Sequence, residues 1–301
     1  MNTKQFQYVL TLAHEGSFSK AADVLNITQP SLSQYIKKIE KEIGLELFSR
    51  TNGDVRITDA GKIYIEAGRK ILDIEHQMEN AINDIAENKT GSLIIGTSPF
   101  RSASMMPSVA ERFKTLHPHM YLVIREKTTA ELLEGMEKGE FDLAVTLLPV
   151  DEKRFDHEKL AEEEIVLAVP AKWERLPAAE CDGCRYPAVS TGVLRDHPLV
   201  MLTETQYMQK QLDDLLYDGE NGAVPAVVVK SLEAQIEMVR SGVGMAVVPS
   251  GVRRFCGDGS VCFYSFSDQR VKREPAVIWR KGVRLSETAK ELIEIIKNTA
   301  W

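Results

Sequence analysis

The sequence predicts a modular α/β protein, and three observations along its 301 residues support this fold class. Residues 1–58 have the pattern of a compact helical unit with a terminal hairpin. Residues 59–88 have that of one long helix, and residues 89–301 alternate between strand and helix patterns. The spacing of apolar residues is the main sequence signal of secondary structure, and it differs in each region. We therefore expect an N-terminal winged helix-turn-helix, a linker helix and an α/β domain, in that order.

The N-terminal unit is predicted to contain three helices. Apolar residues at i, i+3, i+4 and i+7 mark the first helix, and a second amphipathic pattern follows Ser17, a suitable N-cap. Thr28 is placed to cap a third helix. This helix tolerates Pro30 in its first turn, because the amide hydrogens there have no helical partners. Two short helices, a tight turn and a third helix constitute a helix-turn-helix.

The third helix has two different faces. Leu32, Ile36 and Ile39 recur at the spacing of a core-facing stripe. The opposite face carries Gln, Ser and Lys, which are residue types that contact base edges and phosphates. A solvated helix face is the plainer interpretation, but the helix-turn-helix context favours DNA binding. The residues of this segment expected to contact DNA are Thr28, Gln29, Pro30, Ser31, Ser33, Gln34, Lys37 and Lys38.

A small basic hairpin is predicted directly after the third helix. Asn52 and Gly53 favour a tight turn with positive φ, and Arg50 and Arg56 flank it. Beside a recognition helix, such a hairpin is a wing placed to contact the DNA backbone or the minor groove; the alternative is an ordinary surface turn. Residues 1–58 contain seven Lys and Arg against six Asp and Glu, so the position of individual cations, rather than excess charge, must hold the DNA.

Residues 59–88 form one helical pattern without proline. Thirty residues rise about 45 Å, too long for the apolar stripe to be buried against so small a neighbouring unit. Pairing between two protomers is the economical interpretation, and packing on its own domain is the weaker alternative. Dimerisation also suits DNA binding, because two recognition helices can read two half-sites. The stripe consists of Ile63, Ala67, Ile71, Ile74, Met78, Ala81, Ile82 and Ile85.

The segment SFSKAADVLNITQPSLSQYIKKIEKEIGLELFSR, followed by TDAG and a long helix, resembles the N-terminal region of LysR-type transcriptional regulators. The resemblance runs without a gap from about residue 3 to 62. The departures are Ile57, where the family usually has Leu, and the variable wing residues 52–54. The resemblance implies a regulator that binds an interrupted palindromic operator as a homodimer or tetramer and responds to a small-molecule effector. It implies no cofactor and no membrane partner.

Residues 89–301 contain short β-rich runs separated by helical patterns, which favours α/β units around a mostly parallel sheet. The resemblance implies two α/β subdomains, as in periplasmic solute-binding proteins, with a ligand cleft between them. Strands would cross near Glu163–Pro170 and Asp268–Lys272. Subdomain I would then comprise about 91–163 and 269–301, and subdomain II about 164–268. The β-rich runs are 91–98, 120–126, 141–148, 163–170, 198–202, 226–229, 244–249, 262–266 and 272–280.

Ligands of open α/β sheets lie beyond the carboxyl ends of strands, near helix N-termini. Ser98 follows the first strand and opens a helix, and Thr128 begins a capping box after the second. Hydroxyls and amides there suit an anionic small molecule, although each threonine alone could be only a cap. Matching positions in LysR-type regulators commonly line the effector pocket. The expected effector-binding residues are Ser98, Phe100, Arg101, Thr128, Thr129, Thr146 and Thr203.

Composition and motifs exclude several other functions. The net charge of −7 argues against binding nucleic acid by bulk charge alone. We find no signal peptide and no run approaching the roughly 18 apolar residues of a membrane span, so we expect a cytoplasmic protein. No GxSxG, P-loop, HExxH or dinucleotide motif is present, so we expect no enzymatic activity. The alternative from another class is a solute-binding or enzymatic α/β module fused to a DNA-binding unit.

The cysteines leave one further alternative open. Cys181 and Cys184 form a CDGC motif, which is compatible with a thiol- or metal-responsive regulator. A second CxxC is missing, because Cys256 and Cys262 are separated by five residues. We therefore expect cysteines without a metal. The acidic run 162–164 is interpreted as a solvated charge run.

Overall fold

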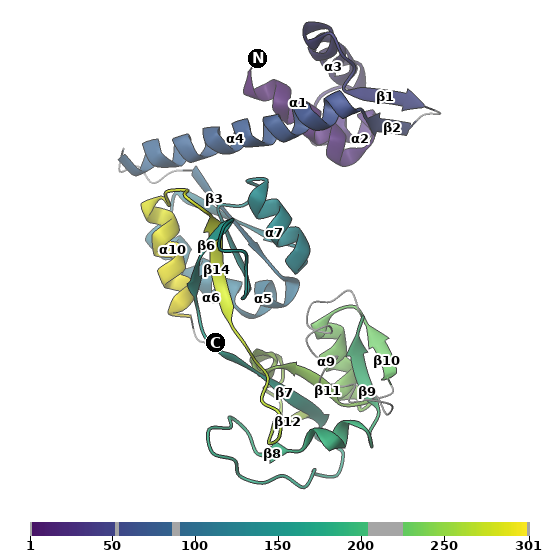
Figure 1. Ribbon diagram of the computed structural model, residues 1–301, viewed down its shortest axis with the longest axis vertical. Coiled ribbons are helices and arrows are strands. Elements are labelled where there is room, and N and C mark those ends of the chain that lie inside the picture. The colour runs from purple at the N-terminus through teal and green to yellow at the C-terminus, as the bar shows by residue number, and fades with distance from the viewer. Residues whose placement is uncertain (1, 52–53, 86–90, 204–224, 300–301) are drawn as a thin grey trace. The chain divides into compact units, whose positions relative to one another are not determined.

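The computed structural model describes residues 2–51, 54–85, 91–203 and 225–299 (Figure 1). The chain divides into two compact units. The first comprises residues 1–92 and 134–142, and the second comprises residues 93–133 and 143–301. Within the described helices, none combines the length and apolar character needed to cross a membrane.

The first unit begins with the three predicted helices, which confirms the helix-turn-helix. Asn2 caps the first helix in a capping box with Gln5, and Gly16 ends it in the left-handed conformation, φ 60°. The side chain of Thr28 caps the third helix, and Pro30 occupies its first turn. The helices are α1 (Thr3–Glu15), α2 (Phe18–Val24) and α3 (Gln29–Ile43). Their core comprises Val9, Leu12, Ala21, Ala22, Leu32, Ile36 and Ile39, with Leu47 and Phe48 of the following segment.

The predicted hairpin is present beside α3. Strands β1 (Phe48–Thr51) and β2 (Asp54–Ile57) pair antiparallel, with Ser49 opposite Arg56. Arg50 belongs to β1, and the side chain of Arg56 is exposed. The predicted turn at Asn52 and Gly53 lies outside the described residues.

The long helix α4 (Asp59–Ile85) follows the hairpin, and the last part of the predicted segment, 86–88, lies outside the described residues. Its first turns pack on α1, where the ring of Tyr64 lies 5.2 Å from that of Phe6. Most of its apolar stripe is exposed: Ile63 is 72% and Ile74 64% accessible. An exposed apolar stripe of this length is typical of a surface that packs against another chain.

The second unit contains a five-stranded sheet in the order β4-β3-β5-β14-β6. Strands β3 and β5 are parallel, whereas β14 is antiparallel to both β5 and β6. The core on this sheet includes Ile95, Phe113, Val277 and Leu292, contributed by strands and by α6 and α10. The elements are β3 (Gly91–Thr97), α5 (Pro99–Ser104), α6 (Met106–Leu116), β4 (Met120–Glu126), α7 (Thr129–Glu137), β5 (Leu143–Leu147), β6 (Phe155–Lys159), β14 (Pro275–Arg280) and α10 (Glu287–Lys297).

A second sheet has the order β11-β7-β12-β8, with β13 also paired to β7. Both β11 and β12 are antiparallel to β7, so the expectation of a mostly parallel sheet was wrong for this half. Strands β9 and β10 form a separate parallel pair. The elements are β7 (Glu163–Pro170), β8 (Ala188–Val189), η1 (Thr191–Leu194), β9 (Leu199–Leu202), β10 (Pro225–Val229), α9 (Leu232–Ser241), β11 (Ala246–Pro249), η2 (Ser250–Phe255), β12 (Val261–Phe266) and β13 (Lys272–Arg273).

Two segments cross between the two sheets, close to the predicted positions. The chain leaves the first sheet after β6 and enters the second as β7; it returns through β13 and β14 (Figure 1). The crossing segments pair with each other, with Lys272 opposite Glu164 and Arg273 opposite Glu163. This confirms two α/β subdomains connected by crossing strands.

Candidate functional site

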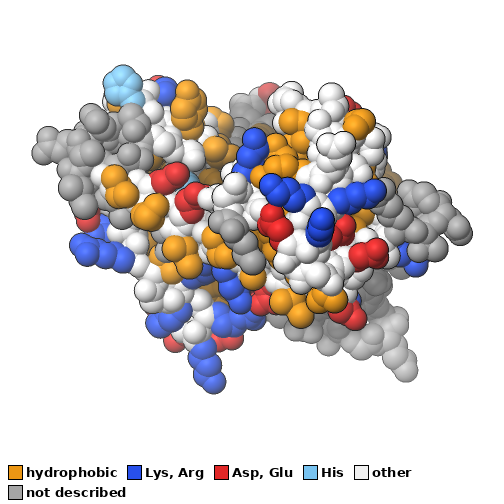
Figure 2. All heavy atoms as spheres, turned by 90° about the horizontal axis from the view of Figure 1, so that it is seen from above, with side chains coloured by type: hydrophobic (Ala, Val, Ile, Leu, Met, Phe, Trp, Pro, Cys, Tyr) orange, Lys and Arg blue, Asp and Glu red, His pale blue; other side chains and the backbone are white. Residues whose placement is uncertain are grey.

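The outer face of α3 presents the predicted DNA-contacting side chains to solvent. Burial of Leu32, Ile36 and Ile39 fixes the rotation of the helix. On the other side Ser33 is half-buried, and the exposed residues are Thr28, Gln29, Pro30, Ser31, Gln34, Lys37 and Lys38. On the face of the molecule shown in Figure 2, Lys and Arg side chains are interspersed with Asp and Glu.

A cavity of about 580 Å³ lies in the second unit. It is bordered by the carboxyl ends of β4, β5 and β9 and by the first turns of α5, α7 and α9. This is the position expected for a ligand of an α/β sheet. The lining residues are Ser98, Pro99, Phe100, Arg101, Glu126, Lys127, Thr128, Thr129, Glu131, Leu132, Val145, Thr146, Leu147, Leu202, Lys230, Ser231, Leu232, Glu233 and Arg273.

The structure brings together six of the seven predicted effector-binding residues, and Thr203 is the exception. Its backbone N–H donates to the carbonyl of Val229 at 3.0 Å, which continues the β9–β10 pairing beyond the end of β9. Leu202 lines the cavity in its place. The second subdomain also contributes residues 230–233, which were not among the predicted effector-binding residues.

The hydroxyls in the cavity wall differ in their hydrogen bonding. Ser98 Oγ accepts from the Arg101 N–H at 3.3 Å. Thr128 Oγ1 donates to Glu131 Oε2 at 2.8 Å, so its proton is already used inside a capping box. Thr146 is 4% exposed, and its Oγ1 has no hydrogen-bond partner among the described residues. A buried hydroxyl without a protein partner indicates water or a ligand, since buried polar groups are nearly always hydrogen-bonded.

A buried ion-pair triad, which we call the Glu163 triad, borders the cavity through Arg101 and Arg273. Glu163 Oε2 accepts from Arg101 Nη2 at 3.1 Å and from Arg273 Nε at 2.9 Å. Glu163 is 6% exposed, so the interpretation of residues 162–164 as a solvated run was wrong for its central residue. In this run Glu162 is exposed, Glu164 is half-buried and Glu163 is buried, and the local sequence does not distinguish them.

The triad carries a net positive charge, because two guanidinium groups share one carboxylate. Burial alone would raise the pKa of Glu163, but the charges of Arg273 and Arg101 outweigh it and hold that pKa below its ordinary value. Burial lowers the pKa of Arg101 to about 10, against the attraction of Glu163. Arg101 therefore remains charged at neutral pH. Arg101 was predicted as an effector contact; in the structure it lines the cavity and pairs with Glu163 of crossing strand β7.

Two helices of at least two turns begin at the cavity. Thr128 precedes α7, and Ser231 caps α9 by accepting from the Ala234 N–H at 3.2 Å. The unpaired amides of a first helical turn carry partial positive charge. Lys127 and Lys230 stand beside these two starts and also line the cavity. The site is thus rich in donors, with apolar walls supplied by Phe100, Leu132, Val145, Leu147, Leu202 and Leu232.

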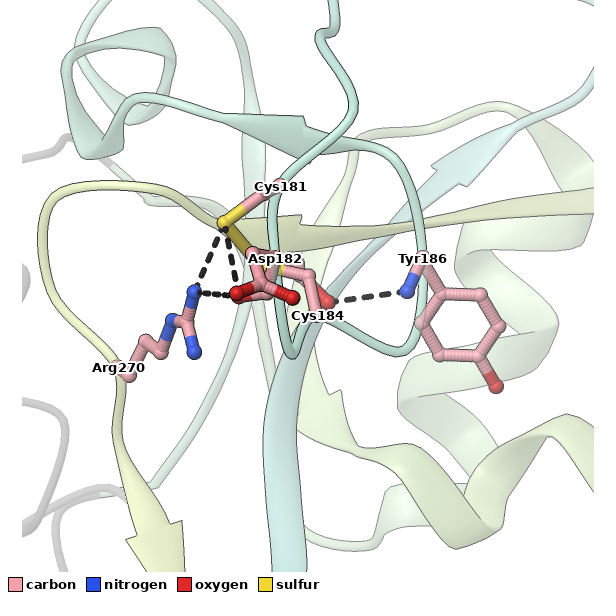
Figure 3. The surroundings of a disulfide bond; sticks show 6 residues. Cys181, Asp182, Cys184, Tyr186 and Arg270 are labelled. Atoms are coloured by element: carbon pink, nitrogen blue, oxygen red, sulfur yellow. Dashed lines mark hydrogen bonds between the residues drawn. A yellow bond between two sulfur atoms is a disulfide. The ribbon is translucent and has the colours of Figure 1, made fainter.

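The CDGC cysteines lie apart from the cavity, in the loop between β7 and β8. Cys181 and Cys184 form a disulfide, and Arg270 contacts the sulfur of Cys181 (Figure 3). Across the part of the chain that is described, no group of three His, Cys, Asp or Glu could hold a metal ion.

Comparison with known proteins assigns both parts of the chain. The family profile for the bacterial regulatory helix-turn-helix protein, lysR family, matches residues 3–62, and that for the LysR substrate binding domain matches residues 86–301. YcgK of Bacillus subtilis, an uncharacterised HTH-type transcriptional regulator, is 31% identical over 99% of this chain and 95% of its own length.

Two further relatives extend this comparison. A hydrogen peroxide-inducible genes activator of Pectobacterium carotovorum is 26% identical over 99% of this chain and 96% of its own length. A full-length OxyR variant from Pseudomonas aeruginosa superposes with a TM-score of 0.73 at 25% identity, covering 100% of this chain and 99% of that one. The chain therefore belongs to the LysR family of transcriptional regulators, with a DNA-binding helix-turn-helix and an effector-binding domain.

Proposed function

We propose that this LysR-family regulator binds an interrupted palindromic operator and that a small anionic effector in the cavity modulates its activity. The observation that carries the proposal is Thr146, whose buried hydroxyl lies in the cavity wall without a partner among the described residues. A ligand carboxylate would accept the hydrogen bond that this hydroxyl has to donate. We also propose that the protein acts in the cytoplasm, where the DNA is, and that it is not an enzyme.

Charge supports an anion in preference to a neutral ligand. The Glu163 triad is net positive, and the first turns of α7 and α9 add unpaired amides. Charge-assisted hydrogen bonds at a buried site contribute about 1.5–3 kcal/mol each. Phe100 and Leu232 offer apolar contact on the same walls, so a carboxylate with an aromatic or aliphatic body fits the lining better than an inorganic anion.

The test compares two buried threonines. Thr146→Val removes the cavity hydroxyl at nearly constant volume. Thr97→Val removes another buried hydroxyl without a described partner, in a residue that does not line the cavity. Calorimetry with a panel of aliphatic and aromatic carboxylates should identify a ligand whose affinity falls about tenfold or more in Thr146→Val, on the hydrogen-bond estimate above. Thr97→Val should bind it like the wild type.

Two results would contradict the anionic proposal. The first is tight binding of a neutral analogue by the wild type, with no preference for the carboxylate. The second is equal loss of affinity in both threonine variants, which would indicate a general effect of hydroxyl removal on the fold.

We further propose that α4 pairs two protomers. Ile71 and Ile74 are both exposed in the middle of the stripe, so Ile71→Asp with Ile74→Asp would place like charges in an apolar seam. Sedimentation should then show monomers, and operator affinity should fall. The matched control is Ile71→Val with Ile74→Val, which keeps the stripe apolar and should remain dimeric. A dimeric Asp variant would mean that the chains pair elsewhere.

A thiol-responsive regulator is the second candidate. The Cys181–Cys184 disulfide favours it, because two sulfurs three residues apart in one loop can be oxidised and reduced without unfolding the domain. The hydrogen peroxide-inducible genes activator is a relative named for an oxidant response, although that name describes only the relative.

A further inference from the structure

We propose that Cys181 and Cys184 form a reversible dithiol–disulfide site and that Arg270 transmits its oxidation state to crossing strand β13. The inference rests on the proposed regulatory function, because it supplies that function with a second input. In this proposal Cys181 reacts first, the oxidant is a hydroperoxide, and Arg270 connects the disulfide to the cavity through β13. None of the residues in the CDGC motif lines the cavity itself.

The loop is shaped to bring the two sulfurs and one guanidinium together. The Cys184 N–H donates to the Cys181 carbonyl at 3.1 Å, which closes a tight turn with the two Cα atoms 5.4 Å apart. Gly183 within this turn has φ +70°, a conformation that residues with a side chain rarely adopt. A Cβ at Gly183 would also lie 3.2 Å from Arg270 Nη1. Glycine therefore permits both the turn and the close approach of Arg270.

Arg270 distinguishes the two sulfurs chemically. Its Nη2 donates to Cys181 Sγ at 2.9 Å and also to the carbonyl of Asp182 (Figure 3). A neighbouring cation stabilises a thiolate, and the thiolate is the nucleophile. Both cysteines of the motif are half-buried, so small oxidants can reach them. Cys256 is the contrast, because burial raises the pKa of its thiol and keeps it protonated.

A hydroperoxide is the oxidant class that fits a two-electron step at this site. The Cys181 thiolate attacks the terminal peroxide oxygen, the O–O bond breaks, and the leaving oxygen takes a proton to depart as water or alcohol. Cys181 is then a sulfenic acid. The Cys184 thiolate attacks this sulfur, the S–S bond forms, and hydroxide departs and combines with the proton lost by Cys184. Two electrons pass from the thiols to the peroxide, and an external dithiol returns them by exchange.

A short segment connects this loop to the cavity. Asp268 accepts from Ser190 Oγ at 2.7 Å, so the segment is held to the second sheet just before Arg270. The Val271 carbonyl accepts from the Ile165 N–H at 2.9 Å on β7. Two residues later, Arg273 joins Glu163 and lines the cavity. Oxidation replaces the charged contact between the Cys181 thiolate and Arg270 with a contact to a neutral disulfide sulfur, and so weakens one anchor of β13.

The first experiment follows the chemistry on the full chain. The protein is reduced with dithiothreitol, separated from it and treated with stoichiometric hydrogen peroxide. Intact mass should show loss of two hydrogens, with peptide mapping placing the bond between Cys181 and Cys184. Cys184→Ser should stop at a sulfenic acid on Cys181 that dimedone traps. Cys262→Ser, which removes a free cysteine, should still form the disulfide. Failure of the pair to form, or first oxidation at Cys256 or Cys262, would overturn the site.

The second experiment uses hydrogen exchange to measure how the oxidation state of Cys181 and Cys184 affects β7 and β13. It is done without effector or DNA. Peptides covering 163–170 and 271–275 should exchange at least about fivefold faster in the oxidised protein than in the reduced one, at the lower end of typical coupling between sites. Arg270→Gln should remove this difference by making exchange fast in both states. The control is Arg175→Gln, which changes an exposed arginine of the same loop and should preserve the difference.

Equal exchange in the two oxidation states of the wild type would overturn the transmission, and so would a difference that persists in Arg270→Gln. Because neither measurement involves a cavity ligand, these outcomes are independent of whether the effector is an anion.

Discussion

The recognition helix α3 and the cavity present their polar groups in opposite ways. On α3 the predicted contacts come from one continuous stretch, and almost all of them are exposed. The cavity takes its lining from six separate segments, and its strongest charges are already bound to each other in the Glu163 triad. An exposed face that binds DNA requires only that the helix is rotated so that its polar side chains point to solvent. A cavity that holds charge away from water must neutralise most of it internally.

This difference predicts different responses to single substitutions. Changes on α3 should alter DNA binding and leave the fold intact, because those side chains make few contacts with the rest of the unit. Changes in the triad should alter stability first. The following substitutions test that contrast.

The largest effect is expected for Glu163→Gln. This change leaves Arg101 and Arg273 buried beside a neutral amide, and breaking a buried ion pair in this way costs about 3–5 kcal/mol. Denaturant unfolding should show the loss in the second unit, while operator binding by the helix-turn-helix is retained. Glu164→Gln is the control, because Glu164 is its half-buried neighbour on β7. An equally small effect in both variants would show that the triad does not hold the crossing strands.

The same residue gives a pH dependence with a defined sign. The pKa of Glu163 is lower in the folded protein than its ordinary value of 4.5. Its contribution to stability is therefore fully present above about pH 4.5 and is lost as the pH falls through the folded-state pKa. Wild-type unfolding free energy should fall on acidification in this range, and the Glu163→Gln variant should lack that component. A variant with the wild-type pH profile would assign the acid sensitivity to other carboxylates.

An intermediate effect is expected on α3. Gln34→Ala should weaken operator binding by about 1–3 kcal/mol and relax base preference at one position. Lys37→Ala should weaken binding to all sequences similarly and flatten the salt dependence, because it removes a phosphate contact. Titrations at several salt concentrations separate the two variants. Unchanged specificity and salt dependence in both would mean that another face of the unit contacts DNA.

The smallest effect is expected for the threonine N-caps, one on α3 and one on α7. Thr28 Oγ1 accepts from the Ser31 N–H, and Thr128 Oγ1 accepts from the Glu131 N–H, each at 3.4 Å. Replacing either threonine with Ala should cost about 1 kcal/mol of stability in its own unit. Thr28→Ala should weaken DNA binding alone and Thr128→Ala effector binding alone, as measured by titration with each ligand. Loss of both activities in either variant would mean that the two regions are not independent.

The sequence predicted the local elements well, for a physical reason. The helices of the first unit are specified by caps and apolar stripes within a few residues, such as Thr28 and the Leu32–Ile36–Ile39 row. Ser98 and Thr128 were found in the same way, because a cap is a local signal. Most buried strands of the second unit are also continuous apolar runs. The strand Phe155–Lys159 was missed, because four of its five residues are charged or polar and have no apolar alternation.

The rest of the site depends on contacts between distant segments. Nothing around Glu163 shows that Arg101, 62 residues earlier, and Arg273, 110 residues later, meet at one of its oxygens. Thr203 was placed in the cavity because it follows a strand, but backbone pairing with Val229 fixes that position instead. Arg273, Lys127 and Lys230 were missed for the same reason. Which strand ends lie side by side depends on the order of the strands in the folded sheets, and the sequence does not reveal that order.

The paired crossing of β7 and β13 also determines how the two subdomains can move. A two-stranded ribbon bends readily across its flat face, but sliding one strand along the other would break every hydrogen bond of the pair at once. We therefore expect the subdomains to move by bending of this paired segment, without sliding of one strand along the other. A ligand that contacts both subdomains would then stabilise one bending angle of the paired segment.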